Sequence, residues 1–135
     1  MKRARVLIAD DHPVFRQALT EVLELAGFDI VGQAVDGTDA VLLARQLVPD
    51  LVLIDLSMPV LNGLDATRLL RETLPAARVV VLTAFDSGEL EQAALDAGAS
   101  AYLVKGTNLE TVEATLTRVM SEPDAGREPR RAPRP

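Results

Sequence analysis

The sequence predicts an α/β domain built around a parallel sheet. Short, uninterrupted apolar runs alternate with longer segments in which apolar residues recur at helical spacing, and this pattern repeats five times within 135 residues. Apolar runs without alternation are typical of strands that are buried on both faces of a parallel sheet. The predicted strands cover residues 6–9, 28–34, 51–54, 79–82 and 101–104.

The first two segments between strands carry the start and stop signals of helices. Pro13 suits a first helical turn, and Gly27 follows the last apolar position of the first segment. The second segment begins after the turn Asp36-Gly37-Thr38 and is stopped by Pro49. We therefore expect one helix that begins at Pro13 and a second whose apolar stripe runs through residues 40–48.

Three further helices complete the pattern. A helix from about residue 64 to 73 follows the turn signal Asn62-Gly63 and ends before Pro75. A fourth runs to Ala97, and a fifth is closed by Pro123. Their expected caps pair a polar residue with an acid three positions later, Asp86 with Glu89 and Thr107 with Glu110.

Strict alternation of strands and helices implies a parallel sheet with right-handed crossovers. The chain of 135 residues is too short for an eight-fold barrel. We therefore predict a flavodoxin-like (βα)5 fold, a three-layer sandwich whose parallel strands lie in the order 2-1-3-4-5. In that order the first and third strands are neighbours at the switch point of the sheet, where ligands bind.

Polar residues follow four of the predicted strands directly. They are Asp10 and Asp11 after the first strand, Asp55 after the third, Thr83 after the fourth and Lys105 after the fifth. The carboxyl ends of parallel strands form the ligand crevice, so these side chains should meet. Clustered carboxylates repel one another and need a cation, and Mg²⁺ is the natural choice for oxygen ligands. The ammonium and the hydroxyl then suit an anion beside the metal, and phosphoryl is the obvious one.

Composition limits the remaining possibilities. The chain has no Cys, which excludes disulfides and thiolate metal sites, and no apolar stretch long enough to span a bilayer. We expect a cytoplasmic protein that does not interact with membranes. Residues 1–120 hold 10 Lys and Arg against 17 Asp and Glu, which argues against direct nucleic acid binding by the domain. We expect the domain to cover residues 1–121, and residues 122–135, with four Arg and four Pro, to form a disordered tail or linker.

These motifs resemble the receiver domain of bacterial two-component response regulators. The resemblance covers residues 4–120 and is carried by five separated groups: Asp10-Asp11, Asp55 with Met58-Pro59, Asn62-Gly63, Thr83-Ala84, and Lys105. Asp11-His12-Pro13 and Thr83-Ala84-Phe85 look like the NarL/FixJ-type subfamily, whose members usually carry a C-terminal helix-turn-helix of the LuxR type. Many receivers have Pro after the Lys, whereas this chain has Gly106, so the isomer of that peptide bond is open.

The resemblance implies a role for each residue. Asp55 would accept a phosphoryl group from a sensor histidine kinase, and Lys105 would pair with the phosphoryl oxygens. Asp10, Asp11, Asp55 and the backbone carbonyl of Ser57 would hold Mg²⁺. Thr83 would hydrogen-bond a phosphoryl oxygen, and Tyr102 would be the aromatic residue whose rotamer reports it. The output would take one of two forms. Either the domain switches an interaction surface, such as that of a phosphorylation-dependent homodimer, or it regulates a DNA-binding part that is absent from this chain.

Other interpretations of the same residues predict different outcomes. Asp10 and Asp11 are also suited to cap the first helix. His12 is equally suited to a capping position or to the protein surface. A phosphatase of the haloacid dehalogenase type also uses a strand-end Asp with Mg²⁺, but it has a second Asp two positions later, where this chain has Ser57. A flavin-binding module shares the fold, but three carboxylates would repel the flavin phosphate.

Overall fold

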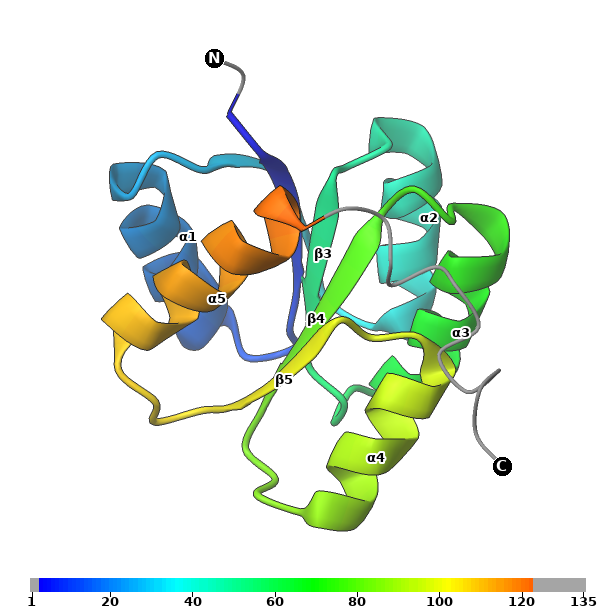
Figure 1. The fold of residues 1–135 in the computed structure, drawn as a ribbon. Helices are drawn as coiled ribbons and strands as arrows, with labels where there is room; N and C mark the ends of the chain where they lie inside the picture. Colours follow the sequence, from blue (N-terminus) through cyan, green and yellow to red (C-terminus); the bar gives the residue numbers. More distant parts are fainter. Residues whose placement is uncertain (1–2, 123–135) are drawn as a thin grey trace.

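A computed structural model describes residues 3–122 of the chain and contains five parallel strands and five helices in strict alternation (Figure 1). The strands are β1 (Arg5–Ala9), β2 (Asp29–Ala34), β3 (Leu51–Ile54), β4 (Arg78–Thr83) and β5 (Ala101–Val104). The helices are α1 (Pro13–Leu25), α2 (Gly37–Leu47), α3 (Gly63–Thr73), α4 (Gly88–Ala97) and α5 (Leu109–Ser121). The predicted tail lies outside the described residues, apart from Glu122.

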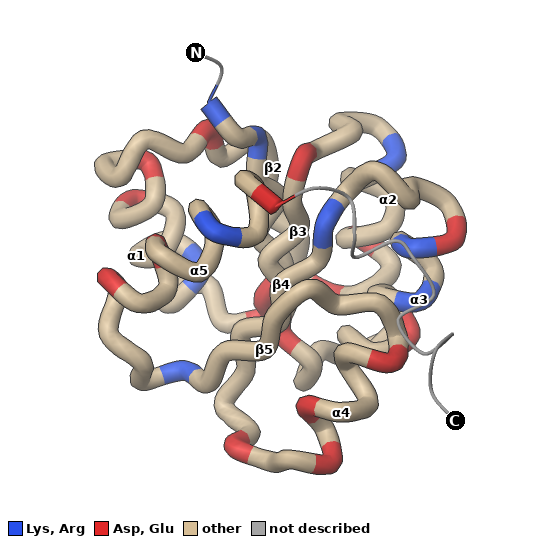
Figure 2. The backbone as a smooth tube through the Cα atoms, viewed as in Figure 1, with Lys and Arg blue, Asp and Glu red and all other residues tan. Residues whose placement is uncertain are grey.

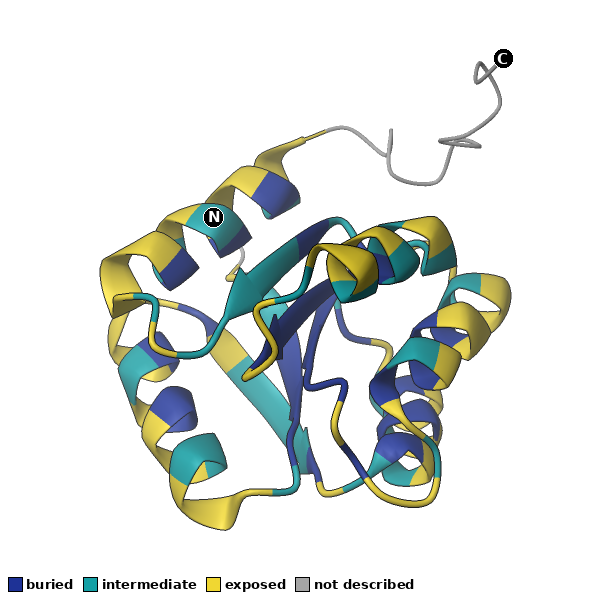
Figure 3. Ribbon diagram, turned by 90° about the horizontal axis from the view of Figure 1, so that it is seen from below, coloured by how far each residue is buried: buried dark blue, intermediate teal, exposed yellow. Residues whose placement is uncertain are grey.

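The sheet has the order β2-β1-β3-β4-β5, and all its pairs are parallel. This confirms the predicted flavodoxin-like topology. Figures 1 and 3 show α1 and α5 on one face of the sheet and the other three helices on the opposite face. The register places Ala9 opposite Ile54, so β1 and β3 end side by side.

Each face of the sheet has its own hydrophobic core. Alternate residues of β1 point to opposite sides: Leu7 belongs to the core under α2, α3 and α4, and Ile8 to the core under α1 and α5. Both side chains are buried, as are all four residues of β3. Burial on both faces explains why the strand sequences are uninterrupted apolar runs.

Two helix caps differ from the predicted ones. Ser87, not Asp86, precedes α4, and its hydroxyl accepts a hydrogen bond from the Leu90 N–H at 3.2 Å. Asn108, not Thr107, precedes α5, because the Thr107 N–H bonds instead to the Val104 carbonyl in a turn after β5. Both helices still begin with a side-chain cap, which satisfies an N–H group that the helix itself leaves unpaired.

The charges of the described part are mixed in sign. Figure 2 shows Lys and Arg scattered over several helices and strands among the acidic residues. Among residues 3–122, none of the helices is long and apolar enough to cross a bilayer.

Candidate functional site

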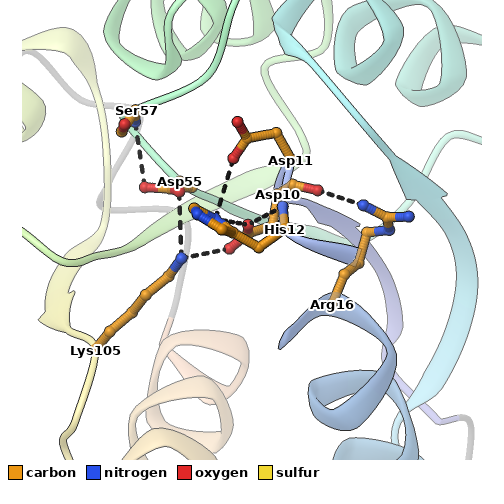
Figure 4. A network of polar contacts seen from close by, with 7 residues as sticks. All are labelled: Asp10, Asp11, His12, Arg16, Asp55, Ser57 and Lys105. Atoms are coloured by element: carbon orange, nitrogen blue, oxygen red, sulfur yellow. Dashed lines mark hydrogen bonds and ion pairs between the residues drawn. The ribbon is translucent and has the colours of Figure 1, made fainter. Parts of the chain in front are cut away.

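The predicted site residues meet at one edge of the sheet. Asp10 follows β1 directly, Asp55 follows β3, Thr83 ends β4 and Lys105 follows β5. Because β1 and β3 are hydrogen-bonded neighbours, the two carboxylates lie side by side, and Figure 4 shows the Lys105 side chain reaching them from β5. Asp10 and Asp55 are each only 2% exposed, so their charges are largely removed from water.

Lys105 balances these two buried carboxylates. Its Nζ lies 2.8 Å from Asp10 Oδ2 and 3.3 Å from Asp55 Oδ2. Burial alone would lower the pKa of Lys105, but hydrogen bonding and the negative charges of Asp10 and Asp55 outweigh it, so the pKa is raised above its ordinary value. The ammonium therefore stays charged at neutral pH. The lysine is thus shared between the two acids, and its contact with Asp10 is the shorter one.

Asp11 lies beside this pair and is less buried. One of its oxygens, Oδ1, is enclosed and makes no hydrogen bond within the described part of the protein, although His12 Nδ1 lies 3.2 Å away. Asp10, Asp11, His12 and Asp55 offer ligand atoms that all lie within 4.8 Å of one another. A buried carboxylate oxygen that makes no hydrogen bond, beside two other carboxylates, fits a hard divalent cation such as Mg²⁺.

Thr83 presents a second unpaired group. Its side chain is fully buried, and its Oγ1 has no hydrogen-bond partner among the described residues. A buried hydroxyl without a partner costs about 1–3 kcal/mol, and each such group in a native protein calls for a specific explanation. Thr83 ends β4, so it lies at the same edge of the sheet as Asp55.

The loop after β3 is held close to Asp55. The Ser57 N–H donates to Asp55 Oδ1 at 3.2 Å, and the Gly63 N–H donates to the Leu56 carbonyl at 3.1 Å. A Cβ at Gly63 would lie only 2.3 Å from the Asp55 carbonyl oxygen, so only glycine allows α3 to approach this closely. The loop thereby fixes both the backbone and the carboxylate of Asp55.

Tyr102, on β5, is tied to the loop after β4. Its hydroxyl donates a 2.6 Å hydrogen bond to the Phe85 carbonyl, and its ring packs against the core under α2, α3 and α4. Burial, followed by the negative charges of Glu91, Asp86 and Asp55, raises the pKa of Tyr102. The tyrosine thus links the edge of the sheet to the segment that begins at Thr83.

Three residues that sequence reasoning left out also contact the site. Arg16 donates to the Asp10 carbonyl at 2.6 Å and to Gln33 Oε1 at 3.0 Å, bracing the end of β1 against β2. The Phe15 ring lies 4.4 Å from Lys105 Nζ, a cation–π contact. His12 Nδ1 lies 3.2 Å from Asp10 Oδ1. Phe15 belongs to the apolar stripe that indicates the first helix in the sequence, but the direction of Phe15 and Arg16 toward the strand ends did not follow from the sequence.

The capping interpretation of the acidic pair is not supported. His12 occupies the N-cap position of α1 without a side-chain cap bond, and Asp10 Oδ1 accepts instead from the His12 N–H at 2.9 Å. Asp10 therefore closes a tight turn before the helix. Its other oxygen remains directed at Lys105.

Comparison with known protein families decides the identity of the fold. The family model for the response regulator receiver domain matches residues 6–117. The chain belongs to this family. The resemblance noted in the sequence is thereby confirmed, and the acidic cluster lies where receiver domains generally bind Mg²⁺.

Individual receiver domains and regulators are similar over most of this chain. The transcriptional regulatory protein PdtaR of Mycobacterium tuberculosis is 48% identical over 101 residues, which are 75% of this chain and 49% of PdtaR. The receiver domain of the response regulator NarL of the same organism has a TM-score of 0.86 and 28% identity, covering 91% of this chain and 100% of that one.

A CheX–CheY complex of Borrelia burgdorferi that contains beryllofluoride and magnesium has a TM-score of 0.84 and 28% identity, covering 88% of this chain and 90% of that one. This receiver domain spans about half the length of the curated relatives that it matches first. Its fold neighbours include a regulator of the LuxR family, consistent with the NarL-like motifs in its sequence.

Proposed function

We propose that this receiver domain accepts a phosphoryl group on Asp55 and uses it to switch an interaction surface. The observation that carries the proposal is the joint placement of Asp55, the shared ammonium of Lys105 and the unpaired hydroxyl of Thr83 at one edge of the sheet. Two of these groups neutralise or bind an anion, and the third is a buried carboxylate able to act as a nucleophile.

The reaction transfers phosphoryl between two amino acid side chains. A carboxylate oxygen of Asp55 forms a bond to phosphorus, the bond from phosphorus to the histidine nitrogen of a sensor kinase breaks, and the imidazole leaves. Because phosphoryl transfer needs positioning and charge neutralisation above all, Lys105 contributes by holding positive charge beside the transferred oxygens. Asp10, Asp11, Asp55 and the Ser57 carbonyl would hold Mg²⁺, which supplies further positive charge when bound.

Phosphorylation would change the charge at Asp55 to about −1.5 to −2. The new oxygens give the Thr83 hydroxyl the acceptor that it lacks, and the loop that follows Thr83 moves with it. Because Tyr102 bonds to the Phe85 carbonyl in that loop, the change reaches the surface formed by α4, β5 and α5. A local event thereby biases a surface with two arrangements.

The upstream partner would be a sensor histidine kinase, and the receiver would act in the cytoplasm. The downstream step would take one of two forms. One is a protein contact or homodimer made by the switched surface alone. The other is control of a DNA-binding part in a longer protein, which is favoured by relatives that are longer than this chain and are named transcriptional regulatory proteins. Residues 1–121 would be the receiver, and 122–135 would be the linker.

Intact-mass analysis tests phosphoryl acceptance. The protein is incubated with acetyl phosphate, with and without Mg²⁺, and we expect one added phosphoryl group only with the metal. Asp55→Asn should block it, whereas Asp86→Asn, at an exposed acid in the loop before α4, should not. Equal phosphorylation of Asp55→Asn contradicts the assignment. Sustained release of phosphate from a phosphomonoester would instead indicate a phosphatase.

A further inference from the structure

Lys105 lies within a tight turn that follows β5. The Thr107 N–H donates to the Val104 carbonyl at 3.1 Å, which closes a four-residue turn over residues 104–107. Gly106 has φ +101°, while Lys105 is not among the described non-glycine residues with positive φ. Positive φ at the third position only is the signature of a type II turn, which strongly favours glycine there.

A second hydrogen bond anchors the same turn to the site. The Lys105 N–H donates to the Thr83 carbonyl at 2.7 Å, extending the pairing of β4 with β5 beyond Val104. The Lys105 backbone is thus fixed from both sides, by β4 and by the turn closed at Thr107. Its ammonium then lies 2.8 Å from Asp10 Oδ2.

We propose that Gly106 is a positioning residue whose left-handed backbone holds the Lys105 ammonium between Asp10 and Asp55. The space around Gly106 is open, because no atom beyond the two neighbouring residues lies within 4 Å of a Cβ built there. A side chain would therefore not collide with the rest of the protein, and its effect would come from the local backbone conformation alone. The importance of this placement for phosphoryl transfer rests on the proposed function, whereas the placement itself does not.

Gly27 provides a matched control. It also has φ +101° with no atom within 4 Å of a built Cβ, and it lies after α1 rather than beside Lys105. Alanine at either position faces the same unfavourable backbone conformation. Both variants should lose stability to a similar extent, but only Gly106→Ala should displace the ammonium.

The chain contains only two lysines, Lys2 and Lys105, which makes the ammonium directly measurable. The protein without donor or metal is treated with a limiting amine acylating reagent, and the labelling of each lysine is followed by peptide mass analysis. Lys105 should react slowly because only 15% of its side chain is exposed and its ammonium contacts two buried carboxylates. Labelling at Lys2 serves as the reference within each sample.

Gly106→Ala should raise Lys105 labelling several-fold relative to Lys2, whereas Gly27→Ala should leave that ratio unchanged at a similar loss of Tm. Gly106→Asn should have a smaller effect than Gly106→Ala, because Asn tolerates positive φ better, and it keeps the test available if the alanine variant does not fold. Unchanged Lys105 labelling in both Gly106 variants, with Tm reduced as in Gly27→Ala, would overturn the proposal. Wild-type protein that is never phosphorylated would contradict the proposed function but not this labelling difference.

Discussion

The hydroxyl of Tyr102 donates a 2.6 Å hydrogen bond to the backbone carbonyl of Phe85, two residues after Thr83. This bond joins the only tyrosine of the chain to the loop that would sense phosphorylation. Rearrangement of that loop must therefore lengthen, break or carry along the Tyr102 contact. The proposed switch should therefore be observable as a change in the environment of Tyr102.

Tyr102 fluorescence should report the switched state. The chain has one Tyr and no Trp, so intrinsic emission comes from this residue alone. Beryllofluoride with Mg²⁺ places fluorines where phosphoryl oxygens would lie, and we expect it to change the emission of the wild type. Thr83→Ala should still bind the adduct but lose most of the change, because the hydroxyl that would contact it is absent. An equal change in Thr83→Ala would show that Thr83 does not transmit the signal.

The ionisation of Tyr102 should be shifted to high pH. Burial and the charges of Glu91, Asp86 and Asp55 raise its pKa above 10.0, so the folded state holds the proton more tightly than the unfolded state. The resulting stabilisation is fully present below the unfolded pKa of about 10 and is lost as pH rises through the folded pKa. Absorbance of tyrosinate measures the midpoint. Glu91→Gln should lower it, and Glu24→Gln on the exposed face of α1 should not; a midpoint at or below the value of free tyrosine contradicts the burial argument.

Asp11→Ala should weaken Mg²⁺ binding by about tenfold or more, because a carboxylate of a hard-cation site is lost. Its Oδ1 makes no hydrogen bond and contacts the exposed ring of His12, so the metal-free protein should lose little stability and gains from reduced repulsion among the acids. Asp10→Ala should instead lower stability, because Lys105 loses its 2.8 Å partner. Calorimetric titration and urea unfolding separate the two effects. Unchanged affinity in Asp11→Ala would remove Asp11 from the metal site.

Gly63→Ala should disturb the phosphoacceptor through the backbone. The new Cβ would lie 2.3 Å from the Asp55 carbonyl oxygen and 2.6 Å from the Leu56 Cα, and backbone atoms cannot yield as a side chain can. We expect a loss of about 1–3 kcal/mol in unfolding free energy and slower phosphorylation. Gly88→Ala is the control, because a Cβ there meets no atom within 4 Å at the start of α4. Equal stability of the two variants would show that α3 can retreat from Asp55.

The fold and most of the site were predictable for the same physical reason. Strands buried on both faces must be apolar throughout, so polar residues after them mark the strand ends, and parallel order brings those ends together. Asp10, Asp55, Thr83 and Lys105 were all found in this way. The roles proposed for them, and for Ser57 and Tyr102, remain predictions.

Details set by three-dimensional direction were not predictable. Asp86 and Ser87 are both good N-cap residues, and the path of the loop from β4 places Ser87 at the N-cap position of α4. Arg16 lies on α1 among surface residues, and its contact with the Asp10 carbonyl depends on where α1 packs against β1. The sequence did not decide the isomer of the Lys105–Gly106 peptide bond. This bond is not cis, since residues 3–122 contain no cis peptide bond.

The most direct test of the central claim is the location of the phosphoryl group. An aspartyl phosphate is reduced by borohydride to homoserine, so phosphorylated and reduced protein can be digested and its peptides sequenced by mass spectrometry. We predict homoserine at position 55 only, dependent on both the donor and Mg²⁺. Homoserine at Asp10 or Asp11, or none at Asp55 in protein whose intact mass shows a phosphoryl group, would contradict the account.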